Sequence, residues 1–276
     1  MLKAITNISK QLIGNIPTLK QRVLFEKLTW VNEKVLKHQE DKKIKTILLS
    51  GCTLYYRRPY ELLHTYKELF ERQIYKFQAT INEPVIIDCG ANIGLSVLYF
   101  KKLYPSAKLI AFEPDEDNFD VLTKNVSANN LSQVQLHKAA IWTHNDRISF
   151  SATGSEASRI LEEQNATLNS AQAFRLADLL GKYNKIDFLK IDIEGAESVV
   201  LEDCKNLLSS VQNLFLEYHG KTSETEKLND ILNIIKLAGF DTYIQNASDN
   251  LLHPFLDKTA NGIYDVQLNI FCYRNK

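Results

Sequence analysis

The stretch that decides the fold of this 276-residue chain is Val85-Ile86-Ile87-Asp88-Cys89-Gly90-Ala91-Asn92-Ile93-Gly94. It is an apolar, β-branched run that stops at an acid and gives way to two glycines, which predicts a strand, a tight turn and the start of a helix. Glycine at positions 90 and 94 removes Cβ atoms where the backbone must approach a ligand and where the helix must approach the strand. Such a turn is expected to aim free backbone amides at whatever lies above the strand.

A second apolar run, Leu109-Ile110-Ala111-Phe112, ends in Glu113, nineteen residues after Gly94. In a nucleoside-binding βαβ unit a carboxylate at about this distance holds the ribose, because it can accept the hydrogens of both hydroxyl groups. The two runs and the glycine turn together predict a nucleoside cofactor bound at the edge of a parallel sheet.

The residues around the glycines indicate which nucleoside cofactor to expect. A dehydrogenase with the G-x-G-x-x-G pattern would need glycine at positions 92 and 95, where this chain has Asn92 and Leu95. The acid Asp88 ahead of the first glycine and the pair Glu113-Pro114 after the second strand instead resemble an S-adenosylmethionine-dependent methyltransferase.

The composition narrows the class of protein. Hydrophobic residues make up 45% and charged residues 24% of the chain, as in an ordinary globular protein. The net charge is zero and no N/D-P-P-Y/F motif occurs, which disfavours a nucleic acid as substrate. The four cysteines are scattered without a C-x-x-C pair, which argues against a zinc site or a disulfide framework.

The sequence also sets expectations about location. Residues 1–16 lack the continuous apolar core of a secretory signal, and nowhere do about 18 apolar residues follow one another. We therefore expect a cytoplasmic protein without a membrane span.

Charge divides the chain into two expected segments. Lysine and arginine outnumber acids by eight in residues 1–80, whereas acids outnumber them by eight in the remainder. We expect residues 1–80 to form a mostly helical cap that shapes the substrate site, and residues 81–276 to form the cofactor-binding domain.

Within the cap, an amphipathic stripe before the polar break at residue 38 predicts a helix. That helix would pack on its own domain or on a second subunit, so a homodimer stays open. A hairpin is expected at 46–58, turning at Ser50-Gly51, and helical spacing returns over 60–77.

From residue 84 onward, strand and helix patterns alternate, which predicts parallel strands joined by crossover helices. The last strand follows the sixth without a helix between them and is expected to be antiparallel. We predict an α/β fold, Rossmann-like, with a seven-stranded, mostly parallel sheet. The expected strands are 85–88, 108–112, 134–138, 186–191, 211–217, 240–244 and 266–273, and the expected helices are 94–103, 116–129, 176–182, 195–208 and 224–238. An extra hairpin is expected at 141–152, before a polar loop at 153–170.

Ligands of open α/β sheets bind outside the carboxyl ends of the strands, so polar residues at those ends are the candidates for catalysis. One buried strand ends in three acids, Asp192, Glu194 and Glu197, and the next delivers Glu217 and His219. Glu197 has a simpler explanation in the first turn of a helix, where an acid favours the positive end of the dipole. The catalytic candidates are therefore Asp192, Glu194, Glu217 and His219.

Three motifs together resemble the FkbM family of S-adenosylmethionine-dependent methyltransferases: Ile87-Asp88-Cys89-Gly90-Ala91-Asn92-Ile93-Gly94, Ala111-Phe112-Glu113-Pro114-Asp115 and Leu189-Lys190-Ile191-Asp192-Ile193-Glu194-Gly195-Ala196-Glu197. The resemblance covers roughly residues 84–273. It implies a class I methyltransferase fold and O-methylation of a hydroxyl on a small molecule, polyketide or saccharide. The cofactor residues that it implies are Asp88, Gly90, Ala91, Asn92, Gly94, Glu113, Pro114, Asp192 and, near the adenine, Ala140.

The spacing of the candidate catalytic residues does not decide how the acceptor hydroxyl loses its proton. A base among the candidates could remove it as the new bond forms, and His219 suits this role with an unperturbed pKa of about 6.5. Alternatively, Mg²⁺ or Mn²⁺ held by Asp192, Glu217 and His219 could lower the pKa of the hydroxyl.

Two other functions compete with methyl transfer. An NAD-dependent oxidoreductase is disfavoured by Asn92 and by the antiparallel last strand. A non-catalytic, cofactor-binding partner protein is disfavoured by the acids between residues 192 and 197, because a module that only binds has no need of them near the cofactor.

Overall fold

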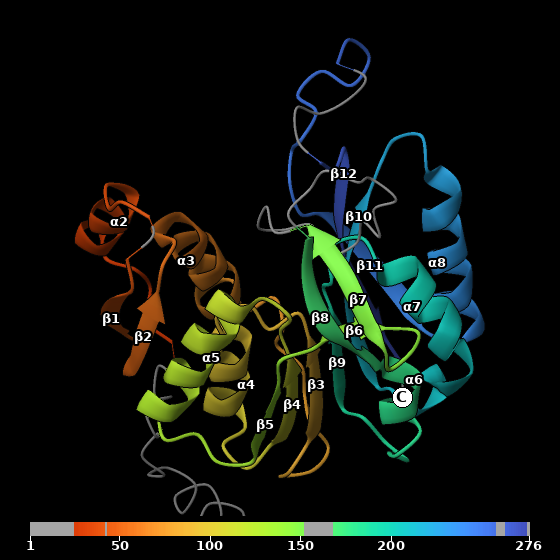
Figure 1. Ribbon diagram of the computed structural model, residues 1–276, viewed down its shortest axis with the longest axis horizontal. Helices are drawn as coiled ribbons and strands as arrows, with labels where there is room; N and C mark the ends of the chain where they lie inside the picture. Colours follow the sequence, from red (N-terminus) through yellow and green to blue (C-terminus); the bar gives the residue numbers. More distant parts are fainter. Residues whose placement is uncertain (1–24, 42, 152–167, 258–262, 275–276) are drawn as a thin grey trace, which may run out of the picture.

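The structure is a computed structural model that describes residues 25–41, 43–151, 168–257 and 263–274. A central sheet lies between two layers of helices (Figure 1), and each layer has its own apolar core against the sheet. One face carries α3 (Pro59–Tyr66), α4 (Leu95–Leu103) and α5 (Glu116–Ala128), and the other carries α6 (Leu176–Leu180), α7 (Glu197–Cys204) and α8 (Thr225–Leu237).

The described part of the chain forms a seven-stranded sheet in the order β11-β12-β10-β9-β3-β4-β5. The strands are β3 (Val85–Cys89), β4 (Lys108–Phe112), β5 (Val134–His137), β9 (Phe188–Ile191), β10 (Asn213–Gly220), β11 (Asp241–Asn246) and β12 (Val266–Tyr273). β12 pairs antiparallel with β10 and β11, and the other pairs are parallel. The predicted Rossmann-like sheet with its antiparallel last strand is confirmed.

The main difference within the sheet is at β10, which continues to Gly220 instead of ending at residue 217. β12 pairs with β10 from Asn213 to Gly220, and this long antiparallel ladder extends the strand. Glu217 and His219 therefore lie inside a strand, two residues apart, so their side chains project from the same face.

The helices lie close to their predicted positions. Asp115 caps α5 by accepting a hydrogen bond from the backbone N–H of Asn118. The helix predicted at 195–208 divides into α7 and the 3₁₀ segment η2 (Lys205–Ser210). Among the residues that the structure describes, no helix is both long enough and apolar enough to cross a membrane.

The two glycines of the loop are required by close contacts within the protein. Gly90 has a φ of +86°, and a Cβ there would lie 1.8 Å from the carbonyl oxygen of Asp192. Gly94 has a φ of +87°, and a Cβ there would lie 2.5 Å from Cδ1 of Leu122 in α5. Within the protein, the close approaches are therefore to the loop after β9 and to helix α5, the second of which differs from the predicted approach to a strand. The approach of Gly90 to a ligand stays a prediction.

The described part of the N-terminal segment contains α2 (Trp30–Lys37), a hairpin of β1 (Lys45–Leu49) and β2 (Cys52–Tyr56), α3, and the π-helical turn η1 (Lys67–Glu71). The hairpin turns at Ser50-Gly51 as predicted, with both residues at positive φ. The helix predicted over 60–77 is shorter, because Gln73 adopts a φ of +54° and leaves the helical path. The prediction for residues 1–24 lies outside the described residues.

The N-terminal segment shares an apolar core with the rest of the fold. Leu62 and Tyr66 of α3 are fully buried in the same cluster as Leu98 and Tyr99 of α4. The division of the chain at residue 80 stays a prediction.

A three-stranded side sheet replaces the hairpin predicted at 141–152. β7 (Arg147–Ser151) pairs antiparallel with β8 (Leu168–Arg175), which also pairs with β6 (Ala140–Trp142). The prediction is wrong because the two strand patterns at 141–152 do not face each other. Their common partner begins at residue 168, inside the region assigned to the polar loop, of which residues 153–167 lie outside the described chain.

Candidate active site

A buried lysine connects the two strand ends at which the site lies. Lys190 of β9 is 4% exposed, and its Nζ lies 3.4 Å from Oδ1 of Asp88 and 3.1 Å from Oδ2 of Asp192. The same Nζ donates a hydrogen bond of 2.6 Å to the carbonyl oxygen of Gly90. Burial opposes the charge of Lys190, but Asp192 and Asp88 outweigh burial and raise the pKa of the lysine well above its ordinary value. Lys190 thereby fastens the glycine loop to β9.

Lys190 was not among the predicted site residues, although the sequence carries a signal for it. It is the one charged residue in the apolar run 188–191, and a buried lysine needs a charged partner. Asp88 is that partner, opposite Lys190 in the register of β3 and β9. Asp88 is fully buried and also accepts a hydrogen bond from the hydroxyl of Ser96 in α4. Asp88 therefore connects the end of β3 to the helix that follows the glycine loop.

The backbone amides of the loop are used inside the protein, contrary to the prediction that they are free. Gly90 and Ala91 both donate to the carbonyl oxygen of Phe112, at 3.0 and 2.9 Å. Asn92 donates through its backbone N–H to Oε2 of Glu113, at 2.8 Å. Because β3 and β4 are neighbours, these bonds tie the loop to the end of β4.

Glu113 holds the loop through its side chain. Besides Asn92, its carboxylate accepts the backbone N–H of Asp115 at 3.0 Å, and the residue is 6% exposed. Burial raises the pKa of Glu113 to about 7, against the two backbone hydrogen bonds, which lower it. An ionised carboxylate offers about four lone-pair sites, so Glu113 keeps acceptor capacity for a ribose hydroxyl.

A cavity of about 90 Å³ lies between the glycine loop and the N-terminal segment. Gly90 and Asn92 line it from the loop, Lys190 and Asp192 from β9 and the residues after it, and Leu62 and Thr65 from α3. Pockets for whole small ligands measure about 300–1,000 Å³, so this cavity suits one end of a nucleoside cofactor.

The second half of the site is a buried histidine among acids. His219 has a side chain that is 2% exposed, and its Nδ1 lies 3.1 Å from Oε1 of Glu197. Its Nε2 lies 3.6 Å from a carboxylate oxygen of Glu194 and 3.6 Å from one of Glu217. Asp192 joins this group, because one ligand atom each of Asp192, Glu194 and His219 lies within 4.8 Å of the others. The structure thus brings all four catalytic candidates together.

Glu197 has a larger part than the prediction gave it. It begins α7, as expected for an acid at a helix start, but it is 1% exposed. Its Oε1 accepts the backbone N–H groups of Ile193 and Gly195 as well as facing His219. The third acid of the motif is therefore the residue that orients the histidine.

The charges around His219 change its expected chemistry. Burial lowers the pKa of His219, but its hydrogen bond to Glu197 and the charges of Glu197, Glu194 and Asp192 outweigh burial and raise the pKa to about 10. The histidine then carries a proton at neutral pH, unlike the free imidazole assumed from the sequence. Burial raises the pKa of Glu194 to about 7, and burial together with the charge of Asp192 raises the pKa of Glu217 to about 8.

Two residues that the sequence did not single out border the acids. Burial raises the pKa of Glu68, in the π-helical turn η1, and the charge of Asp192 adds to this shift. Tyr264, just before β12, donates its hydroxyl to the carbonyl oxygen of Glu194, and its ring centroid lies 5.0 Å from that of His219. The site is therefore bordered by η1 of the N-terminal segment and by Tyr264, which precedes the last strand, β12.

Of the other predicted cofactor residues, Ala91 lines the cavity beside the glycine loop, whereas Ala140 and Pro114 are not among its lining residues. Ala140, in β6, is buried against Ile148 and Ala173 of the side sheet. Pro114 follows Glu113 and is half-buried, and Ala91 is buried within the loop.

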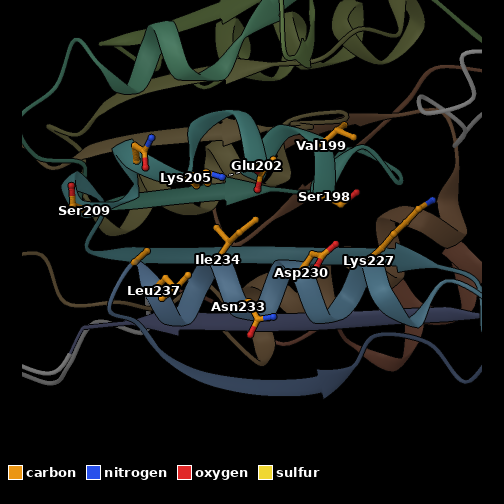
Figure 2. Close-up of a pocket in the computed structure, with 12 residues that line it drawn as sticks. Ser198, Val199, Glu202, Lys205, Ser209, Lys227, Asp230, Asn233, Ile234 and Leu237 are labelled. Carbon is orange, nitrogen blue, oxygen red and sulfur yellow. Dashed lines mark hydrogen bonds and ion pairs between the residues drawn. The ribbon is translucent and has the colours of Figure 1, made fainter.

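A groove of about 890 Å³ lies between α7 and α8, and none of the predicted site residues lines it (Figure 2). Its walls carry exposed charges, among them Glu202 of α7, Lys205 of η2, and Lys227 and Asp230 of α8. The groove is a surface between two helices and belongs to neither half of the site.

The strand order, the glycine loop after β3 and the acid after β4 define the class I, Rossmann-like methyltransferase fold. Comparison with models of protein families matches residues 88–242, more than half of the chain, to the methyltransferase FkbM domain. The chain belongs to this family, as the three motifs predicted.

Curated relatives are similar over about half of the chain. The methyltransferase sdnD of Sordaria araneosa is 31% identical over 172 residues, which cover 50% of this chain and 66% of that protein. The 2-O-methyltransferase NoeI of Sinorhizobium fredii is 28% identical over 156 residues, 49% of this chain and 63% of its own. The hexuronic acid methyltransferase AglP of Haloferax volcanii is 29% identical over 141 residues, 50% of this chain and 57% of its own. The chain spans less than two-thirds of the length of these relatives.

Proposed function

We propose that this protein transfers a methyl group from S-adenosylmethionine to a hydroxyl oxygen of a small molecule, polyketide or saccharide, with a saccharide as the favoured acceptor. The observation that carries the proposal is the glycine loop of an FkbM-family chain, fastened at the carboxyl edge of the sheet by Glu113 and Lys190. The names of two relatives, a 2-O-methyltransferase and a hexuronic acid methyltransferase, support the oxygen and the saccharide.

The residues at this edge fit such a cofactor. Glu113 has lone pairs left for the ribose, and the cavity of about 90 Å³ beside Gly90 suits the amino-acid end. The acids at 192 and 194 give the neighbouring space a negative potential, which favours a positively charged sulfur. When bound, the cofactor supplies a methyl group on that sulfur, and an acceptor oxygen displaces the sulfur as a neutral thioether.

The protein has two tasks, to position the acceptor oxygen and to receive the hydroxyl proton. Glu194 and Glu217 both face His219 across the site, so a hydroxyl held there lies within reach of a carboxylate. His219 already carries a proton in this arrangement, so the carboxylates are better placed to accept one.

Three further expectations stay with this proposal. The N-terminal segment shapes the acceptor side, supported by Leu62, Thr65 and the acid Glu68 beside the site. A homodimer is supported by Trp30 and Val31, which α2 leaves 73% and 59% exposed. A cytoplasmic location remains a prediction from the sequence.

A transfer assay with methyl-labelled S-adenosylmethionine tests the proposal. Saccharides, including hexuronic acids, are offered beside versions whose hydroxyls are already methylated. We expect label on the free saccharides only. Label that appears on amine acceptors and never on hydroxyls would overturn O-methylation, and no transfer to any acceptor offered, together with turnover of NAD, would favour the oxidoreductase.

A further inference from the structure

We propose that a divalent metal ion, Mg²⁺ or Mn²⁺, binds between Asp192, Glu194 and His219. One ligand atom of each residue lies within 4.8 Å of the other two, so a single ion can reach all three. The set differs from the one expected from the sequence, because Glu194 takes the place of Glu217. The two acids follow β9 and the histidine lies near the end of β10, and these strands are neighbours in the sheet.

The histidine is oriented as a metal ligand requires. Its Nδ1 faces Glu197, whose oxygen is held in turn by two backbone amides, so the ring has one fixed orientation. Nε2 then points at Glu194, 3.6 Å away, with the imidazole 2% exposed. Histidines that bind metals usually donate the other ring N–H to a carboxylate in this way, which sets the tautomer and strengthens the ligand.

The charge of the site favours a cation. Five acids meet there, Asp88, Asp192, Glu194, Glu197 and Glu217, and among the described residues Lys190 faces two of them and His219 three. Lys190 is shared between Asp88 and Asp192. A divalent ion at Nε2 would take the place of the proton on that nitrogen and would offset more of the negative charge.

The ligand set suits a hard cation with open positions. Two carboxylates and one imidazole are ligands that Mg²⁺ and Mn²⁺ accept, and three protein ligands leave room for water or for an acceptor oxygen. Asp192 and Glu194 have side chains that are 25% and 33% exposed, so an ion can enter. A hydroxyl bound to the ion would lose its proton more easily. This catalytic role rests on the proposed methyl transfer, whereas binding of the ion does not.

Direct titration tests the site without any assay of activity. The 276-residue protein is freed of metal with a chelator and titrated with Mn²⁺, and the spectrum of free Mn²⁺ is followed by electron paramagnetic resonance. We expect one bound ion per chain. Glu194→Gln and His219→Asn should each weaken binding by about 10–100-fold or more, and Glu197→Gln, which acts through the histidine, by about 10–100-fold. The matched control is Glu202→Gln, the same change on an exposed side chain of α7, which should bind as the wild type does.

The outcomes separate this inference from the proposed function. S-adenosylhomocysteine binding is measured by calorimetry on the same samples. If it binds and Mn²⁺ does not, or if Glu194→Gln binds Mn²⁺ like the wild type, the metal site is wrong and methyl transfer stands. If Mn²⁺ binds as predicted and S-adenosylhomocysteine does not, the metal site stands and the proposed function fails. Should His219→Asn not fold, the partly exposed Glu194 decides the question alone.

Discussion

Asp88 of β3 and Lys190 of β9 are opposite each other in neighbouring parallel strands and form a buried ion pair, with 3.4 Å between Oδ1 and Nζ. The same ammonium holds the carbonyl of Gly90, so the pair fixes the glycine loop from the neighbouring strand. The position of the glycine loop thus depends on a contact between residues about one hundred positions apart in the sequence.

Lys190→Met tests how much this ion pair contributes to the stability of the fold. The change leaves Asp88 buried without its charged partner, and breaking one side of a buried pair costs about 3–5 kcal/mol. We expect the free energy of unfolding, measured by urea denaturation, to fall by about that amount. Lys138→Met, which removes the exposed pair with Glu116, should cost at most about 1 kcal/mol. Equal losses in the two variants would contradict the account.

Glu113→Ala tests the assignment of the ribose acid. Loss of hydrogen bonds to a charged group costs about 1.5–3 kcal/mol, which corresponds to an increase of roughly 10- to 150-fold in the Kd of S-adenosylhomocysteine. Glu116→Ala, three residues on at an exposed position, is the control and should leave the Kd unchanged. An unaltered Kd in Glu113→Ala would mean that another group binds the ribose.

The pKa of Glu113, raised to about 7, predicts a pH dependence of cofactor binding. The ribose hydroxyls donate to the ionised carboxylate, so the affinity for S-adenosylhomocysteine should fall as the pH falls through about 7. The charge of Asp115 raises this pKa and the charge of Lys190 lowers it, and both charges remain in Glu113→Ala, which should lose the pH dependence. The contribution of Glu113 to the stability of the fold changes with pH in the opposite direction to the affinity for the cofactor. Because the folded pKa lies above the ordinary 4.5, the contribution of Glu113 to stability is largest at low pH and is lost as the pH rises through about 7. If the Kd of S-adenosylhomocysteine for the wild type, measured by calorimetry, does not change with pH, the assignment of Glu113 to the ribose is wrong.

Glu217→Gln tests the carboxylate that faces His219 from the same strand. Loss of a general base lowers turnover by about 10²–10⁴-fold. We expect that loss in the methyl-transfer assay, with the Kd of S-adenosylhomocysteine unchanged. Glu224→Gln, in the exposed turn after the strand, should keep full turnover. Full turnover in Glu217→Gln would move the role of base to Glu194 or to water.

Local patterns in the sequence predicted the parts of the fold that depend on local order. Apolar runs, glycines and acids at strand ends correctly placed the sheet, its antiparallel last strand and the cluster around His219. The hairpin at 141–152 failed because periodicity identifies a strand but not its partner, and the partner of β7 begins only at residue 168.

The buried residues that hold the site residues in place were harder to predict, because their contacts depend on which strands are neighbours in the sheet. Lys190 forms an ion pair with Asp88, and Glu197 forms one with His219. In neither pair are the two residues close in the sequence, so the sequence pattern does not show that they meet. Glu197 was explained by the helix dipole, a local effect that is sufficient for an exposed acid. Glu197 does lie in the first turn of α7, but it is also buried, and it makes the further contact with His219.

The central claim is that the loop between Asp88 and Gly94, with Glu113, binds S-adenosylmethionine. The most direct measurement is calorimetric titration of the wild-type protein with S-adenosylmethionine, S-adenosylhomocysteine and NAD under one set of conditions. We expect saturable binding of the first two, with one site per chain, and no heat of binding with NAD. Tight binding of NAD, with no binding of either sulfur compound, would contradict this claim.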